Sequence, residues 1–146
     1  MSVKGELNRI RNTQKEINEL KQRIDEEYYS LLPQAIRYDL DKVQTSPQDR
    51  MPYVMGRIDE HTRIMCDRLS HLLVSKQWAE HLINKLEDTR QRQVLDLYFL
   101  SVERMTMKKI ADKMGYSEQQ TFRYYSEGLK NLENMRANES NRRDNI

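Results

Sequence analysis

Glycine and proline are scarce in this sequence, with four and three copies among 146 residues. Charged residues make up 33% of the chain, and only 37% of the residues are hydrophobic. Long exposed helices have this composition, because an elongated helical body has much surface to cover with charge and little interior to fill. We therefore expect an all-α fold with an extended shape.

Cysteine is nearly absent, and long apolar runs are absent altogether. The single Cys66 cannot form an internal disulfide, which makes a reducing, cytoplasmic setting the expectation. The N-terminal residues MSVKGELNRI lack the apolar core of a signal peptide, and no run of roughly 18 apolar residues occurs. We expect no membrane association.

The sequence offers no set of residues for catalysis or for a metal. His61, His71 and His81 are ten residues apart, so on a helix each is rotated by about 80° from the last and the three do not converge. Cys66 has no glycine-rich nucleophile turn or oriented base beside it. We expect no enzyme, no metal, no cofactor and no small-molecule substrate.

Residues 1–32 have the spacing of a coiled-coil helix. Apolar residues recur every seven positions, and one further leucine supplies the second seam position: Val3, Ile10, Ile17, Leu20, Ile24 and Leu31. These six are the candidate oligomerisation residues. Because the second seam position is otherwise polar, the seam needs another helix to pack against.

A connector at 33–52 and a second long helix at 53–87 follow. Pro33 ends or kinks the first helix, and Ser46 with Pro47 offers one start for the second. The second helix repeats its apolar residues every seven positions, at Ile58, Met65, Leu72, Ala79 and Leu86. The two helices fold back as a hairpin or pair with another copy, and we favour a homo-oligomer, with a dimer first.

Residues 88–136 change period and predict a compact helical module. Asp88 caps its first helix, and the apolar run 94–100 is too short for a membrane and suits a buried helix. The tail at 137–146 has almost no apolar content, which predicts disorder.

Within this module the spacing predicts a helix-turn-helix. Thr106 precedes a helix of about eight residues, Gly115 stands where a left-handed residue ends it, and Ser117 with Gln120 forms a capping box for the next helix. The core-facing positions of that helix are Thr121, Tyr124, Gly128 and Leu132, with Leu129 flanking them. Two helices joined by a tight turn in this way suit the major groove of DNA.

The outward face of the second helix carries residues that read base edges. Gln pairs with adenine, Arg with guanine or phosphate, and an aromatic ring contacts a thymine methyl. Lysines of the first helix lie beside the DNA backbone in such a complex. The candidate DNA-binding residues are Lys108, Lys109, Ser117, Glu118, Gln119, Gln120, Phe122, Arg123 and Glu127.

The stretch Val94 to Leu132, including KKIADKMGYSEQQTFRYYSEGLKNL, resembles region four of sigma factors, the helix-turn-helix that reads an upstream promoter element. With the long helices before it, the arrangement also resembles small phage late-gene regulators of the ArpU and RinA type. The resemblance implies base contacts at Glu118, Gln119 and Arg123, and backbone contacts at Gln120 and Phe122. It also implies double-stranded DNA as the partner, with RNA polymerase as a second, in a bacterial host cell.

Two other functions fit the same elements. A terminase small subunit for DNA packaging combines a helix-turn-helix with coiled-coil helices, although such proteins usually place the DNA-binding part first. An adaptor that binds RNA polymerase or a sigma factor uses the same fold without touching DNA. A sequence-specific transcription regulator remains the favoured function, since the exposed residues of the second helix match base readout.

Overall fold

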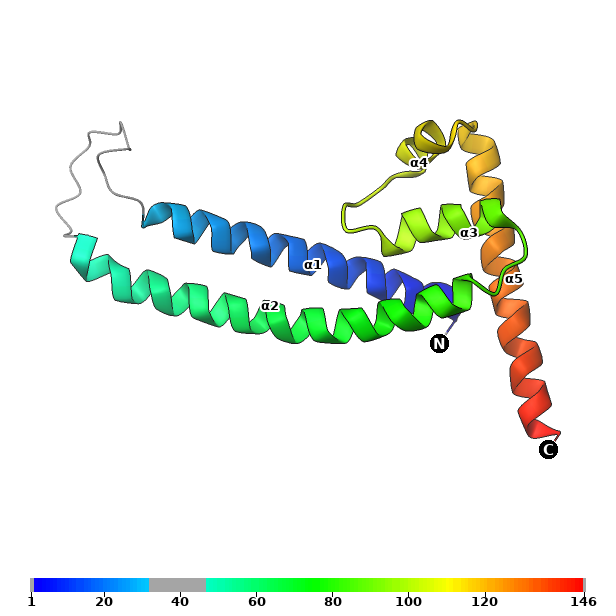
Figure 1. The fold of residues 1–146 in the computed structure, drawn as a ribbon, viewed down its shortest axis with the longest axis horizontal. Helices are drawn as coiled ribbons and strands as arrows, with labels where there is room; N and C mark the ends of the chain where they lie inside the picture. The colour runs from blue at the N-terminus through cyan, green and yellow to red at the C-terminus, as the bar shows by residue number, and fades with distance from the viewer. Residues whose placement is uncertain (1, 32–46, 146) are drawn as a thin grey trace. The chain divides into compact units, whose positions relative to one another are not determined.

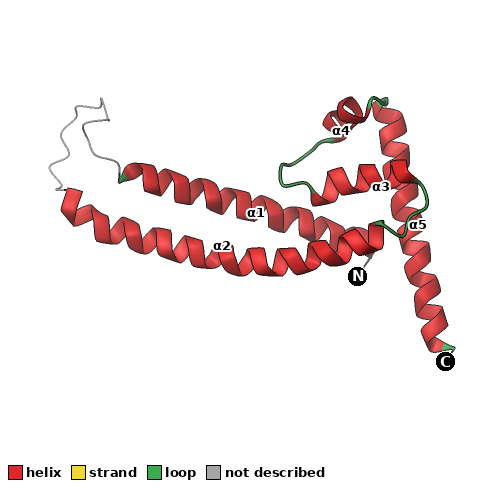
Figure 2. Cartoon of the chain, viewed as in Figure 1, coloured by secondary structure: helices red, strands yellow, loops and turns green. Residues whose placement is uncertain are grey.

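The computed structural model describes residues 2–31 and 47–145, and within them the chain is helical with no strand (Figure 2). The elements in order are α1 (Val3–Ser30), α2 (Pro47–Ile83), α3 (Thr89–Leu95), the π-helix η2 (Asp96–Leu100), α4 (Met107–Met114) and α5 (Glu118–Asp144) (Figure 1). The all-α expectation is confirmed. None of these helices is long and apolar enough to cross a membrane.

Two compact units divide the chain, and the division cuts through α1 and α2. The first, which we call the core unit, joins Met1–Lys15 to Leu72–Ile146, and the second, the hairpin unit, is Glu16–His71. The first four turns of α1 therefore belong with the helix-turn-helix, although about sixty residues of sequence separate them from the rest of that unit.

The hairpin unit pairs the second half of α1 with the first half of α2. Glu27 of α1 accepts hydrogen bonds from Arg57 at 3.0 Å and from His61 at 3.1 Å, and Arg68 donates to Glu16 at 3.0 Å. Residues near the end of α1 thus meet residues near the start of α2, so within this unit the two segments run antiparallel.

The heptad seam is buried within a single chain. Val3 and Ile10 are buried in the core unit, Ile17 and Leu20 are buried in the hairpin unit, and Ile24 and Leu31 are half-buried there. Of the two arrangements that the sequence allowed, a hairpin within one chain or pairing with another copy, the structure has the hairpin within one chain. A role for the seam residues between subunits stays an untested prediction.

The boundaries of the second long helix differ from the expected 53–87. The helix begins at Pro47, so the part of the predicted connector from 47 to 52 is helical, and Pro52 lies inside the helix. Pro52 is past the first turn, so it removes the backbone hydrogen bond that a residue there would donate to the carbonyl of Gln48, and the start of α2 is held by fewer hydrogen bonds than a helix without proline. The helix ends at Ile83, and the rest of the connector, with Pro33 and Ser46, lies outside the described residues.

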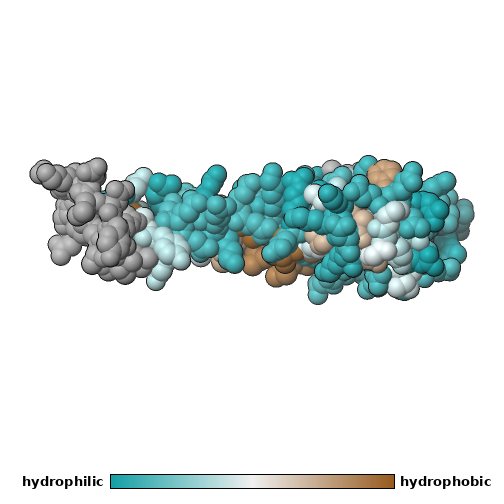
Figure 3. All heavy atoms as spheres, turned by 90° about the horizontal axis from the view of Figure 1, so that it is seen from above, coloured by the Kyte–Doolittle hydropathy of each residue, from teal (hydrophilic) through white to brown (hydrophobic). Residues whose placement is uncertain are grey.

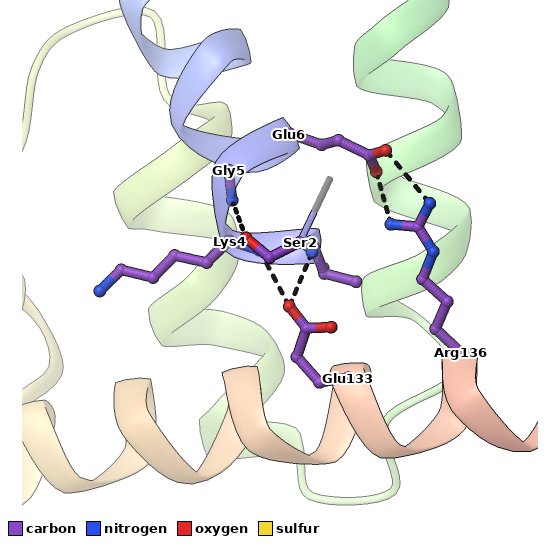
Figure 4. A network of polar contacts seen from close by, with 7 residues as sticks. Ser2, Lys4, Gly5, Glu6, Glu133 and Arg136 are labelled. Carbon is purple, nitrogen blue, oxygen red and sulfur yellow. Dashed lines mark hydrogen bonds and ion pairs between the residues drawn. The ribbon is translucent and has the colours of Figure 1, made fainter.

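Within the core unit the start of α1 is anchored to α5. Val3 and Leu7 are fully buried, and Ile10 is nearly so. The carboxylate of Glu133 accepts hydrogen bonds from the backbone N–H of Val3 at 2.7 Å and of Lys4 at 3.5 Å, which satisfies two unpaired donors of the α1 N-terminus (Figure 4).

A second contact between the same helices is a bidentate ion pair. Both Nη atoms of Arg136 donate to the carboxylate of Glu6, at 3.0 and 3.2 Å (Figure 4). Arginine holds a carboxylate in a fixed orientation through two parallel hydrogen bonds, so this pair sets the angle of α1 as well as its distance.

The prediction of a disordered tail at 137–146 is wrong for the described residues, because α5 continues to Asp144. The sequence pattern misled because these residues bury nothing. The helix is instead supported by charged contacts to other parts of the core unit, including the Glu6–Arg136 pair and a 2.8 Å hydrogen bond from Lys85 to Glu139.

Candidate nucleic-acid interface

The first helix of the helix-turn-helix, α4, begins and ends where the sequence predicts. The Thr106 hydroxyl accepts a hydrogen bond from the backbone N–H of Lys109 at 3.3 Å, which caps the N-terminus. Ile110 and Ala111 are buried, while Lys108 and Lys109 are exposed. The two lysines therefore lie on the solvent side of the first turn of α4.

The turn between α4 and α5 depends on Gly115. Its φ of 74° lies in the left-handed region that L-residues with a Cβ avoid, and its backbone N–H donates to the carbonyl of Ala111 at 2.9 Å. Tyr116 donates to the same carbonyl at 3.1 Å. These two bonds end α4 and bring the chain within two residues to the start of α5.

Ser117 and Gln120 form the predicted capping box at the start of α5. The Gln120 backbone N–H donates to the Ser117 hydroxyl at 3.2 Å, and the Ser117 backbone N–H donates to the Gln120 side-chain oxygen at 3.4 Å. Both side chains are exposed, but the cap occupies the Ser117 hydroxyl oxygen and the Gln120 side-chain oxygen. In the proposed DNA complex, the main role of Ser117 and Gln120 is therefore to fix the direction in which α5 begins.

One face of α5 packs against α3 and α4. The buried residues include all five positions expected from the sequence, together with Tyr125: Thr121, Tyr124, Tyr125, Gly128, Leu129 and Leu132. At Gly128 the helices approach so closely that an added Cβ would lie 2.9 Å from a methyl carbon of Leu95. The small residue thus sets the spacing of α3 and α5.

An aromatic cluster lies under the exposed face. The Tyr125 ring stacks on Phe99 with centroids 5.8 Å apart and meets Tyr98 edge-on at 5.0 Å, and Phe122 lies 6.0 Å from Tyr125. The π-helix η2 carries Tyr98 and Phe99, and both Phe99 and Leu100 are buried. Phe122 therefore joins the exposed surface to the packed interior.

The start of α1 also supports this cluster. The Arg11 guanidinium lies 4.0 Å from the centroid of the Tyr98 ring and donates a 3.0 Å hydrogen bond to the carbonyl of Met105, just before α4. Lys76 of α2 donates to Gln14 at 2.7 Å and to the Leu100 carbonyl at 3.0 Å. Burial lowers the pKa of the Lys76 amine.

The remaining candidate residues gather on the exposed side of α5. Glu118, Gln119, Phe122, Arg123 and Glu127 all point to solvent, and Phe122 remains 57% exposed. Arg123 lies 3.8 Å from Glu127 one turn later, an exposed ion pair that DNA phosphates or a guanine compete with at little cost. The face therefore offers amide, guanidinium and aromatic groups side by side.

Sequence reasoning missed Arg90, which the fold brings to the edge of this face. Its guanidinium donates a 2.9 Å hydrogen bond to the Tyr124 hydroxyl and lies 5.6 Å from the ring centroid, and Arg123 lies 5.6 Å from the same centroid. The hydrogen bond to Tyr124 raises the pKa of Arg90. Two arginines thus flank one tyrosine, and only the packing of α3 on α5 reveals it.

Positive charge is concentrated in the unit that carries this face. The core unit has seventeen Lys and Arg against twelve Asp and Glu, whereas the hairpin unit has eight against eleven. Because phosphate contacts dominate the affinity of proteins for DNA, the excess lies where a nucleic-acid interface needs it. Met1–Lys15 contributes four of the seventeen, so part of this excess depends on the fold, which joins that segment to the C-terminal part of the chain.

The geometry defines a helix-turn-helix protein with an exposed second helix. Comparison with protein families indicates which kind of helix-turn-helix this is. The family model described as Sigma-70, region 4 matches residues 83–134. The matched residues contain α3, η2 and the helix-turn-helix, and the match supports DNA binding and transcription regulation as the role of this part of the chain. No curated protein and no solved structure gives a significant match to the chain.

Proposed function

We propose that the protein is a sequence-specific transcription regulator of a phage or prophage, in which the region 4 domain binds a promoter-proximal site. The main support is that Gln119 and Arg123 project from α5 of a domain assigned to sigma-70 region 4. Both side chains make bidentate contacts to bases in the major groove. The protein acts in the cytoplasm of a bacterial cell, without catalysis, and activates late genes.

The long helices supply what a bare region 4 domain lacks. One domain offers few cations on its exposed face, so two domains held together double the number of phosphate contacts. We propose a homodimer as the DNA-binding form and RNA polymerase as the second partner. The likeness to ArpU and RinA regulators, which also place long helices beside such a domain, motivates this proposal.

The test uses DNA selected from a random double-stranded library, followed by a shift assay at fixed salt. Arg123→Ala and Gln119→Ala should each weaken binding to the selected sequence by about 1 to 3 kcal/mol. Arg68→Ala is the matched control, because Arg68 pairs with Glu16 in the hairpin unit and should leave affinity unchanged. Helix content measured by circular dichroism should stay constant in all three.

Two results would contradict the proposal. If the selection enriches no sequence, the domain does not read bases; capture of RNA polymerase by such a protein would then favour the adaptor function. If the two α5 variants bind as tightly as the parent, Gln119 and Arg123 are not the reading residues.

A further inference from the structure

An exposed, uncharged face lies on the part of α2 that belongs to the core unit. Leu73, Val74 and Trp78 are 57%, 68% and 40% exposed, and Gln77 and His81 are exposed as well. Val74 and Trp78 are four residues apart, so their side chains lie one above the other on the helix. We call these five residues the α2 face.

The α2 face stands out against the rest of the surface. Charged residues form a third of the chain, and hydrophilic side chains cover most of the surface seen in Figure 3, with hydrophobic ones in only a few places. From Leu73 to Ala79 the one charged residue is Lys76, whose amine is bound to Gln14 and to the Leu100 carbonyl. Grouped exposed apolar residues mark sites of interaction.

The chemistry of the face selects its partner. A nucleic acid or an anionic surface needs lysines or arginines, and the outward side chains here include none. A second copy of the same face brings no like charges together. In an antiparallel, two-fold arrangement, Val74 of each copy lies against Trp78 of the other, so these two exposed apolar side chains each gain an apolar partner.

We propose that two copies of the chain pair through the α2 face. This names the surface of the dimer in the proposed function and rests on that dimer, whereas the sequence had suggested the α1 seam. The seam is unsuited to the role because Val3, Ile10, Ile17 and Leu20 are buried within the chain.

The size of the face sets the strength of the dimer. Its five residues span about two turns, and each partner in a stable complex buries about 800 Å². The α2 face is smaller than that. The dimer therefore dissociates on dilution through the micromolar range, and DNA that holds two copies side by side strengthens it.

Sedimentation of the full chain over a range of concentrations tests the proposal. The mean mass should rise from 17.6 kDa towards twice that value. Trp78 is the single tryptophan, so its emission should shift to shorter wavelength as the dimer forms. Val74→Glu should remain monomeric throughout. Val102→Glu is the matched control, because Val102 is a similarly exposed valine, at 62%, in the segment between η2 and α4 and outside the α2 face, and it should dimerise as the parent does.

A crosslinking experiment covers the case in which Val74→Glu fails to fold. Gln77→Cys and Val102→Cys, each in a Cys66→Ser background, are treated with a short bismaleimide. The Gln77→Cys chain should crosslink to dimers and the Val102→Cys chain should not. A parent protein that stays monomeric at high micromolar concentration, or equal crosslinking at both positions, overturns the proposal.

The same samples separate this proposal from the DNA-binding function. If the parent dimerises through the α2 face yet the selection enriches no DNA sequence, the surface is right and the function is wrong. If DNA binds with sequence preference to a chain that stays monomeric, the regulator function stands, whereas the homodimer and the α2 face as its surface are wrong.

Discussion

The core unit and the hairpin unit use the same kinds of residue in different ways. Among the described residues, the largest fully buried side chains all lie in the core unit, including Leu7, Leu72, Phe99 and Leu132. The buried apolar residues of the hairpin unit retain 6 to 7% exposure, and ion pairs such as Glu27–Arg57 lie beside them. In the core unit several helices surround each buried side chain, whereas in the hairpin unit only two helices pack together and one side of each buried residue stays partly open to solvent.

Charge divides the two units in the same way. The core unit has an excess of basic residues and the hairpin unit an excess of acidic ones. An excess of acidic residues repels DNA phosphates, so the contrast favours the core unit for the proposed DNA contact. It also means that α1 contributes to both, since its first turns lie in the basic core unit and its remainder in the acidic hairpin.

The largest effect expected from this contrast concerns two leucines of α1. Leu7→Ala should lower the free energy of unfolding by about 2 to 5 kcal/mol, because Leu7 is fully buried in the core unit. Leu20→Ala, in the more open hairpin unit, should cost no more than about 2 kcal/mol. Chemical denaturation followed by circular dichroism measures both. Equal losses would show that the hairpin is packed as tightly as the core.

A second comparison uses two arginines that each lie beside a tyrosine. Arg90→Gln should weaken DNA binding by about 1 kcal/mol and reduce the salt dependence by about one phosphate contact, whatever the DNA sequence. Arg57 lies 5.8 Å from Tyr53 in the hairpin unit, and Arg57→Gln should leave binding unchanged. Shift assays at several salt concentrations decide. An equal loss from both variants would mean that the hairpin also touches DNA.

The smallest effects concern two carboxylates, one that lowers the free energy of unfolding and one that raises it. Loss of hydration and the nearby Glu80 carboxylate raise the pKa of Asp96, although Lys76 opposes them. Its ionised form thus costs stability at neutral pH, so Asp96→Asn should raise the free energy of unfolding there by less than about 1 kcal/mol. Glu27→Gln should lower it by a similar amount, because Arg57 loses the opposite charge and one of the two oxygens that meet Arg57 and His61 becomes an NH2 group.

The test is to measure the free energy of unfolding of Asp96→Asn and of the parent protein as a function of pH. Asp96 binds its proton more tightly in the folded protein, so its cost appears as pH rises through the ordinary carboxyl range towards the raised pKa. Below about pH 3 the advantage of Asp96→Asn should disappear, since the parent side chain is then mostly neutral in both the folded and the unfolded state. An advantage that persists in acid would point to packing instead of charge.

Much of the helix-turn-helix could be predicted because its determinants are local. Thr106, Gly115 and Ser117 act within three or four residues of the helix ends that they cap. The alternation of buried and exposed positions from Thr121 to Leu132 follows from the helical period alone. The tail beyond that stretch was predicted wrongly because its support comes from Lys85 and Glu6, which lie far away in sequence.

The sequence by itself thus determined the helix-turn-helix, the face of α5 that points outward and the heptad stripe of α1, because each depends on neighbours within one or two turns. Only the tertiary structure decided that the stripe is buried within the chain, that its first turns join the DNA-binding unit, and that Arg90 meets Tyr124. These are contacts between distant segments, and an apolar stripe does not specify which partner covers it.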